Sequence, residues 1–84
     1  MRALTLNAGN LAADHRHLYT AETLHYQAAF RRNGNEVAWN ARVRLAGEVV
    51  GELAGVTPIG HEAYSVLEVV RGAVDDEIDR HLFV

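Results

Sequence analysis

The stretch Thr23–Gly55, TLHYQAAFRRNGNEVAWNARVRLAGEVVGELAG, decides the fold. Apolar residues alternate with polar ones from Leu24 to Phe30 and again from Val37 to Leu45. Strict alternation is the pattern of a strand that buries one face. Two short glycine-containing segments separate three such runs. The stretch therefore predicts a β-meander of three consecutive antiparallel strands.

The first turn of this meander is predicted at Asn33-Gly34, because both residues tolerate the positive φ of a type I′ hairpin turn. A two-residue loop at this position sets Phe30 opposite Val37 on the apolar face. On the polar face it sets Arg31 opposite Glu36. Every apolar residue of the two strands would then meet another on the same side of the sheet.

The second turn is predicted as a three-residue loop over residues 45–47, with its glycine in the left-handed conformation. This loop sets Val43 opposite Val49. It also places Trp39 between Ala28 and Leu53, in the middle of the sheet. Trp39 is thus expected at the centre of the hydrophobic core.

The chain before the meander predicts less regular structure. Residues 2–6 could form a short edge strand, which would make the sheet four-stranded. Asn10 could cap a short helix over residues 11–19. Residues 7–10 read as a turn between these two elements.

A long helix is predicted after the meander. Thr57-Pro58 is a typical helix start, since threonine can cap and proline suits the first helical position. The regular helix is expected from His61 to Leu82, and Gly72 would be a close-packing point or a bend. One face carries an apolar stripe at helical spacing, made of Ala63, Tyr64, Leu67, Val70, Val74, Ile78 and Leu82.

Composition restricts the chemistry of this 84-residue chain, which we expect to form one domain over residues 1–84. It has no cysteine, so disulfides and thiolate catalysis are excluded. All eight basic residues are arginine, which excludes a catalytic lysine. The net charge of −3 disfavours general attraction to nucleic acid or an anionic membrane. We expect no membrane association and a cytoplasmic location, because the chain shows no signal-peptide pattern and no long apolar run.

No catalytic or metal-binding motif can be assembled from the titratable residues. His15 and His17 could face the same way on an extended chain, but a metal site usually needs three or four ligands. Ser65 is predicted on the polar helix face without an adjacent histidine. The acidic run at residues 75–79 is spread around the helix and reads as a solvated face. We therefore expect no metal, no cofactor and no enzymatic activity.

One candidate surface is the open face of the predicted sheet. Arg31, Arg42 and Arg44 would lie there with His25, in a mixture able to contact phosphate and polar base edges. The alternative is an ordinary solvated face whose arginines pair with glutamates on neighbouring strands.

A second candidate surface is a side stripe on the helix, formed by Val66, Val69 and Ala73 with Phe83 nearby. These apolar residues lie beside the core stripe and need cover. A partner subunit or the N-terminal segment of the same chain could supply that cover.

The element order resembles that of double-stranded RNA-binding domains, provided that residues 11–19 are helical. In that family a basic cluster at the start of the last helix holds phosphates. Here the corresponding stretch, residues 57–62, has neither lysine nor arginine. The resemblance therefore implies a topology and transfers no site.

Together these observations predict an α+β domain with a three-stranded or four-stranded antiparallel meander and a long C-terminal helix on one face, to which residues 11–19 could add a short N-terminal helix. We expect an interaction module that binds another protein or itself, with homodimerisation as one form. The alternative function is nucleic-acid binding through the arginines of the open face.

Overall fold

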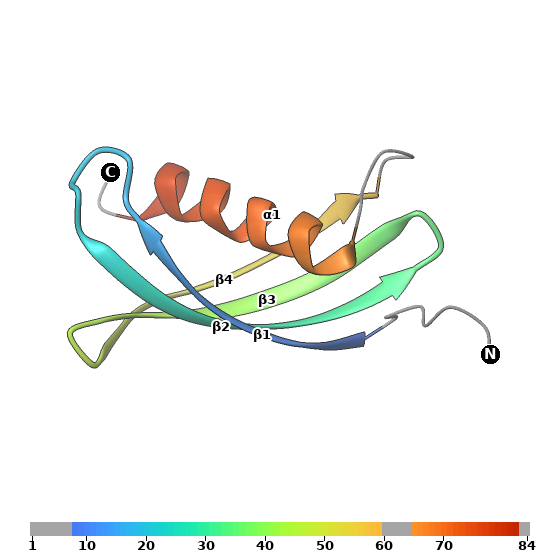
Figure 1. Ribbon diagram of the computed structural model, residues 1–84, viewed down its shortest axis with the longest axis horizontal. Helices are drawn as coiled ribbons and strands as arrows, with labels where there is room; N and C mark the ends of the chain where they lie inside the picture. The colour runs from blue at the N-terminus through green and yellow to red at the C-terminus, as the bar shows by residue number, and fades with distance from the viewer. Residues whose placement is uncertain (1–7, 60–64, 83–84) are drawn as a thin grey trace.

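A computed structural model describes residues 8–59 and 65–82 of the chain. Its strands form one antiparallel sheet in the order β1-β2-β3-β4, so each strand pairs with its neighbours in sequence. The helix of the described residues lies on one face of this sheet (Figure 1). The predicted α+β meander is confirmed, with four strands. The elements are β1 (Ala8–Arg16), β2 (Thr23–Asn33), β3 (Glu36–Leu45), β4 (Glu48–Pro58) and α1 (Val66–His81).

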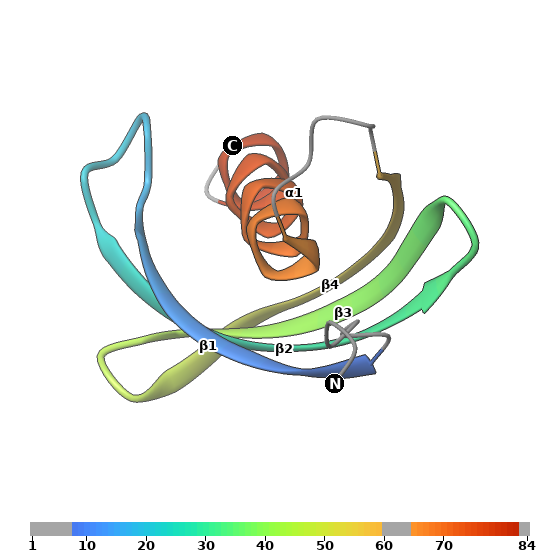
Figure 2. The ribbon, with the colours of Figure 1, turned by 45° about the vertical axis from the view of Figure 1, so that its right-hand side comes forward.

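The sheet is strongly curved and wraps around the helix, which lies on its concave side (Figure 2). Alternate side chains of each strand point toward the helix, because successive residues of a strand face opposite sides. In β2 and β3 this alternation matches burial residue by residue over most of each strand. The core consists of Leu24, Tyr26, Ala28, Phe30, Val37, Trp39, Ala41, Val43, Val66, Val70, Val74 and Ile78.

The first hairpin turns one residue later than the sequence predicts. Asn33 pairs with Glu36, and the loop consists of residues 34–35. Gly34 has φ of 64°, whereas Asn35, the second loop residue, is outside the positive-φ region. This combination is typical of a type II′ turn, which requires glycine only at its first position. Phe30 therefore faces Trp39, and the expected pairs of Phe30 with Val37 and of Arg31 with Glu36 are wrong.

The second hairpin has a two-residue loop, Ala46-Gly47, in place of the predicted three. Both loop residues have positive φ, 52° and 85°, as a type I′ turn requires. A β-bulge next to Val43 then shifts the register, and Trp39 faces Gly55 instead of Leu53. The first hairpin differs from prediction by two positions, and so does the second beyond its bulge, so the apolar faces are preserved there.

The predicted helix over residues 11–19 is wrong, because residues 8–16 form the edge strand β1. This strand pairs with β2 over its whole length, from Ala8 with Arg31 to Arg16 with Thr23. Its partly buried residues, including Leu11 and Ala13, pack against the core. The resemblance to double-stranded RNA-binding domains required a helix here and therefore fails. The edge strand predicted at residues 2–6 lies outside the described residues.

The helix begins later than predicted, because Thr57 and Pro58 belong to β4. Ser65 is extended and caps the helix, and its Oγ accepts a hydrogen bond from the N–H of Glu68 at 3.1 Å. The predicted helical residues 61–64 lie outside the described residues. Leu67, predicted on the core stripe, is 36% exposed, and Val66 takes its place in the core.

The described residues contain no helix with the length and hydropathy that a bilayer span requires.

Candidate interaction surfaces

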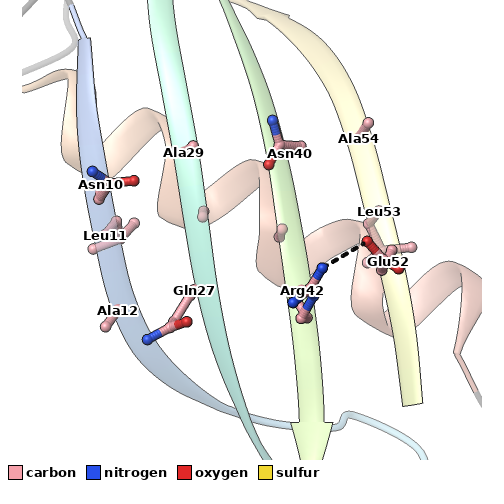
Figure 3. Close-up of a pocket in the computed structure, with 12 residues that line it drawn as sticks. Asn10, Leu11, Ala12, Gln27, Ala29, Asn40, Arg42, Glu52, Leu53 and Ala54 are labelled. Carbon is pink, nitrogen blue, oxygen red and sulfur yellow. Dashed lines mark ion pairs between the residues drawn. The ribbon is translucent and has the colours of Figure 1, made fainter. Parts of the chain in front are cut away.

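The open face of the sheet is the side opposite the helix. Strand pairing aligns small and amide side chains across its centre, where Asn10, Ala29, Asn40 and Ala54 form one row. They line a shallow hollow of about 690 Å³ together with the next row (Figure 3). The centre of this face is therefore a platform of short side chains. The next row consists of Ala12, Gln27, Arg42 and Glu52.

The residues predicted as an anion-binding surface all lie on this open face. Arg31 and Arg42 point to solvent, and Arg44 is half-buried. Arg31 lies six positions along the sheet from His25, which pairs with Arg44, so they are about 20 Å apart at 3.3 Å per residue. The predicted residues thus share a face without converging on one point.

Acidic residues accompany two members of this basic set. Arg42 forms an ion pair with Glu52, with 3.6 Å between Nη2 and Oε1. The ring of His25 hydrogen-bonds the carboxylate of Asp14 through Nδ1. Because both pairs are more than half exposed, each contributes little to stability. Their effect is to offset the positive potential of this face.

The side stripe predicted on the helix is more buried than expected. Val66 is only 8% exposed and belongs to the core. Val69 and Ala73 are partly buried and pack against the core. Phe83 lies outside the described residues. Val66, Val69 and Ala73 therefore expose less apolar surface than the sequence predicted.

The loop between β1 and β2 is organised around His17, which is 1% exposed. Its Nδ1 accepts hydrogen bonds from the backbone N–H groups of Tyr19, at 3.1 Å, and Thr20, at 3.3 Å. Its Nε2 lies 2.6 Å from the carbonyl oxygen of Leu82, at the end of α1. A neutral ring with its proton on Nε2 satisfies all three contacts. His17 therefore joins the loop to the end of the helix.

The backbone of this loop is also closed by its own hydrogen bonds. The N–H of His17 donates to the carbonyl of Glu22 at 2.8 Å, and the N–H of Ala21 donates to the carbonyl of His17 at 3.0 Å. Ala21 has φ of 61°, a left-handed conformation that alanine adopts only at an energetic cost. The surrounding contacts hold this conformation in place.

Two large apolar side chains project from the loop. Leu18 is 69% exposed and Tyr19 is 71% exposed. The N–H of Leu18 donates to Oδ1 of Asp79 at 2.9 Å, which fixes the loop against α1. We call the exposed pair Leu18 and Tyr19 the loop pair. It borders a shallow hollow of about 410 Å³, which Asp76, Asp79 and Arg80 also line.

Asp79 belongs to a polar network beneath the loop pair. Its Oδ1 lies 2.9 Å from Nε2 of His15, whose Nδ1 lies 3.5 Å from Oδ1 of Asp75. Tyr26 donates its hydroxyl to Asp75 at 3.0 Å. Burial alone would raise the pKa of Asp79, but the hydrogen bonds from His15 and the Leu18 N–H outweigh burial and lower it. Burial, with the adjacent Asp75 carboxylate, raises the pKa of Tyr26 well above its usual value.

The chemistry available to this network is limited. His15 and His17 both turn toward the helix, but His17 is occupied by backbone groups and His15 by two carboxylates. Within residues 8–59 and 65–82 no group of three or more histidines and carboxylates is arranged to hold a metal ion. Ser65 caps the helix and sits beside no general base that the described contacts reveal. The network is suited to positioning the loop.

Sequence reasoning missed the loop pair because it assigned Leu18 and Tyr19 to a helix. One sequence signal could have revealed the loop pair: two large apolar residues stand next to a run that is rich in small and polar residues. Comparisons with protein-family models, curated proteins and solved structures found no significant match to this chain.

Proposed function

We propose that this protein is a non-enzymatic interaction module that binds another protein through the loop pair. The observation that carries the proposal is the exposure of Leu18 and Tyr19 on a loop whose backbone is held by a buried histidine. Scattered exposed apolar residues need no explanation, but two adjacent large ones on an organised loop are unusual.

Organisation of the loop favours binding for an energetic reason. A flexible loop loses conformational entropy when a partner orders it, whereas a held loop has lost that freedom on folding. His17, Asp79 and the strained Ala21 all restrict this loop. Tyrosine adds large contact area with few rotatable bonds and is enriched among the residues that dominate binding energy. The partner would offer an apolar pocket for the Tyr19 ring.

The experiment selects binders from a displayed library of protein fragments, using the immobilised chain as bait. The double variant Leu18→Ser, Tyr19→Ala should weaken the selected binders by about 2 kcal/mol or more, which is about thirtyfold in Kd. The matched control is Val56→Ser, which removes an apolar side chain that is 61% exposed on the open face. This control should bind as the wild type does.

Two outcomes would count against the proposal. Binders that lose affinity with Val56→Ser but keep it with the loop variant would place the interaction on the sheet. Failure to select any binder above the background of an unrelated bait would remove the loop pair as a binding site. Circular dichroism of each variant must first match the wild type, so that a lost interaction is not a lost fold.

Nucleic-acid binding by the open face remains the second candidate function. It is favoured by one observation: among the described residues, Arg31 and Arg44 have no carboxylate within ion-pair distance. An amide NMR titration with short RNA and DNA at low salt tests it. Shifts at Arg31 and Arg44 that fade with added salt and vanish in the Arg31→Ala, Arg44→Ala variant would support this function over the first.

A further inference from the structure

The outer edge of β1 is unpaired among the described residues, because β1 and β4 are the two edge strands of the sheet. β1 is nine residues long and pairs with β2 without interruption. Its free edge therefore presents a regular row of backbone N–H and C=O groups. Such a row is a template for pairing with another strand.

The two edges differ in their protection. β4 contains a register shift opposite Val43 and Arg44, two glycines and a terminal proline, Pro58. Bulges and proline are devices by which proteins discourage pairing at an edge. β1 contains no proline, no lysine and no bulge. Among its exposed side chains, those of Ala8, Asn10 and Ala12 are short and uncharged and do not obstruct an approaching strand, while Asp14 and Arg16 are charged.

We propose that β1 pairs antiparallel with β1 of a second copy of this chain, with the two-fold axis at Ala12. In this register small side chains face large ones and no two like charges are opposed, which favours pairing across the strands. All nine residues of each strand take part. The cross-strand pairs are Ala8 with Arg16, Gly9 with His15, Asn10 with Asp14, Leu11 with Ala13, and Ala12 with itself.

Both faces of this pairing are chemically matched. Leu11 and Ala13, which are partly buried on the helix side, would cover one another. On the open face the Asn10 amide could donate to the Asp14 carboxylate of the second copy. A two-fold axis at Leu11 or at Ala13 would shift the register by two positions and lose two cross-strand pairs. The axis at Leu11 would oppose Leu11 to Leu11, and the axis at Ala13 would oppose Leu11 to His15. The register centred on Ala12 therefore gives the longest and best matched contact.

The product would be one continuous eight-stranded sheet with both helices on the same side. Because the strands run antiparallel, the two loop pairs would lie at opposite ends of β1 and remain free. The inference does not depend on the function proposed for the loop pair. If both hold, the dimer presents two binding loops.

Solution mass measured by sedimentation or light scattering tests the pairing. The wild type should approach twice its chain mass of 9.3 kDa as concentration rises. The variant Ala12→Glu should raise the dimer Kd by about tenfold, because it opposes two carboxylates directly and brings each near Asp14 of the other copy. The matched control is Ala54→Glu on β4, which is also exposed and also two residues from an acid, Glu52. It should dimerise as the wild type does.

A cysteine pair checks the register independently of stability. The chain has no cysteine, so Ala12→Cys introduces a single thiol. Under mild oxidation it should form a covalent dimer much faster than Ala54→Cys, since only the two-fold position brings identical residues together. A mixture of Asn10→Cys and Asp14→Cys chains should cross-link to the heterodimer.

Three results would overturn the inference. The first is a wild type that stays monomeric at every concentration. The second is a dimer that resists Ala12→Glu but is lost with Ala54→Glu. The third, which decides the matter even if Ala12→Glu fails to fold, is equal cross-linking of Ala12→Cys and Ala54→Cys.

Discussion

Replacing Asp79 with alanine should loosen the loop that carries Leu18 and Tyr19. One carboxylate oxygen, Oδ1, accepts hydrogen bonds from the backbone N–H of Leu18 and from Nε2 of His15, each at 2.9 Å. The substitution therefore removes two contacts between the β1 end of the sheet and α1 in a single step. Its effect should be felt both in global stability and in the local order of the loop.

The magnitude follows from the surroundings of the two bonds. The His15 contact is charge-assisted and lies in a region where both side chains are less than one-fifth exposed, so it should contribute about 1.5 kcal/mol. The Leu18 N–H is exposed, and water can replace its partner, so this bond should add only about 0.5 kcal/mol. The expected loss is about 2 kcal/mol.

Urea denaturation measures this loss. With a slope of about 1 kcal/mol per molar, the midpoint of Asp79→Ala should fall by about 2 M. The matched control is Asp76→Ala, which removes an exposed carboxylate paired only with Arg80 at 3.1 Å in the described contacts. That variant should lose at most about 0.5 kcal/mol. Equal midpoints for the two variants would refute the assignment of Asp79 as the residue that fixes the loop.

The pH dependence provides a second reading of the same variant. Because the folded pKa of Asp79 lies below its ordinary value of 3.8, the folded state favours the carboxylate. Its contribution is present above pH 3.8 and is lost as the pH falls through the folded pKa. The stability difference between wild type and Asp79→Ala should therefore shrink below pH 3.8. A difference that stays constant into strong acid would contradict the proposed ionisation.

Three further outcomes test the core. Trp39→Ala should cost about 3 to 5 kcal/mol in thermal or urea unfolding, because Trp39 is a core residue that is only 4% exposed. Gly55→Ala should also destabilise the folded state, since an added Cβ would lie 2.9 Å from Cζ2 of Trp39. The cost of this substitution should be smaller in the Trp39→Ala background. Strictly additive costs for the two substitutions would exclude this clash. Wild-type stability should decline above pH 10.0, the ordinary phenol pKa, because the folded pKa of Tyr26 is raised: its contribution is fully present below pH 10.0 and is lost as the pH rises toward the folded pKa. Tyr26→Phe should show less of this alkaline loss, and an unchanged loss would assign it to other groups.

The register errors have a common cause in turn chemistry. Asn33-Gly34 and the glycine at residue 47 are correct turn signals, yet each fits two loop placements that differ by one residue. A glycine can occupy the first position of a type II′ turn or the second of a type I′ turn. The choice depends on which placement aligns the strands over the helix, and that is decided by packing. The bulge beside Val43 likewise leaves no mark in the sequence.

The first strand illustrates how packing overrides local preference. Residues 8–16, AGNLAADHR, contain alanine, glycine, asparagine and aspartate, all of which are poor strand formers. In isolation they favour a turn followed by a capped helix. The strand is stabilised instead by pairing with the exposed edge of β2. It is also stabilised by contacts on the concave side, made by Leu11, Ala13 and His15. The sheet supplies this stabilisation, so the segment alone cannot indicate it.

The sequence by itself determined the meander of residues 23–55, its buried face, the presence of a C-terminal helix and the Arg-bearing open face. Strand alternation and helical spacing are local patterns, and burial of one face follows directly from them. Only the tertiary structure decided that His17 is buried, that Asp79 meets His15, and that Leu18 and Tyr19 project. These contacts join residues more than 60 positions apart. Long-range contacts depend on how the sheet curves around the helix, and no local pattern encodes that curvature.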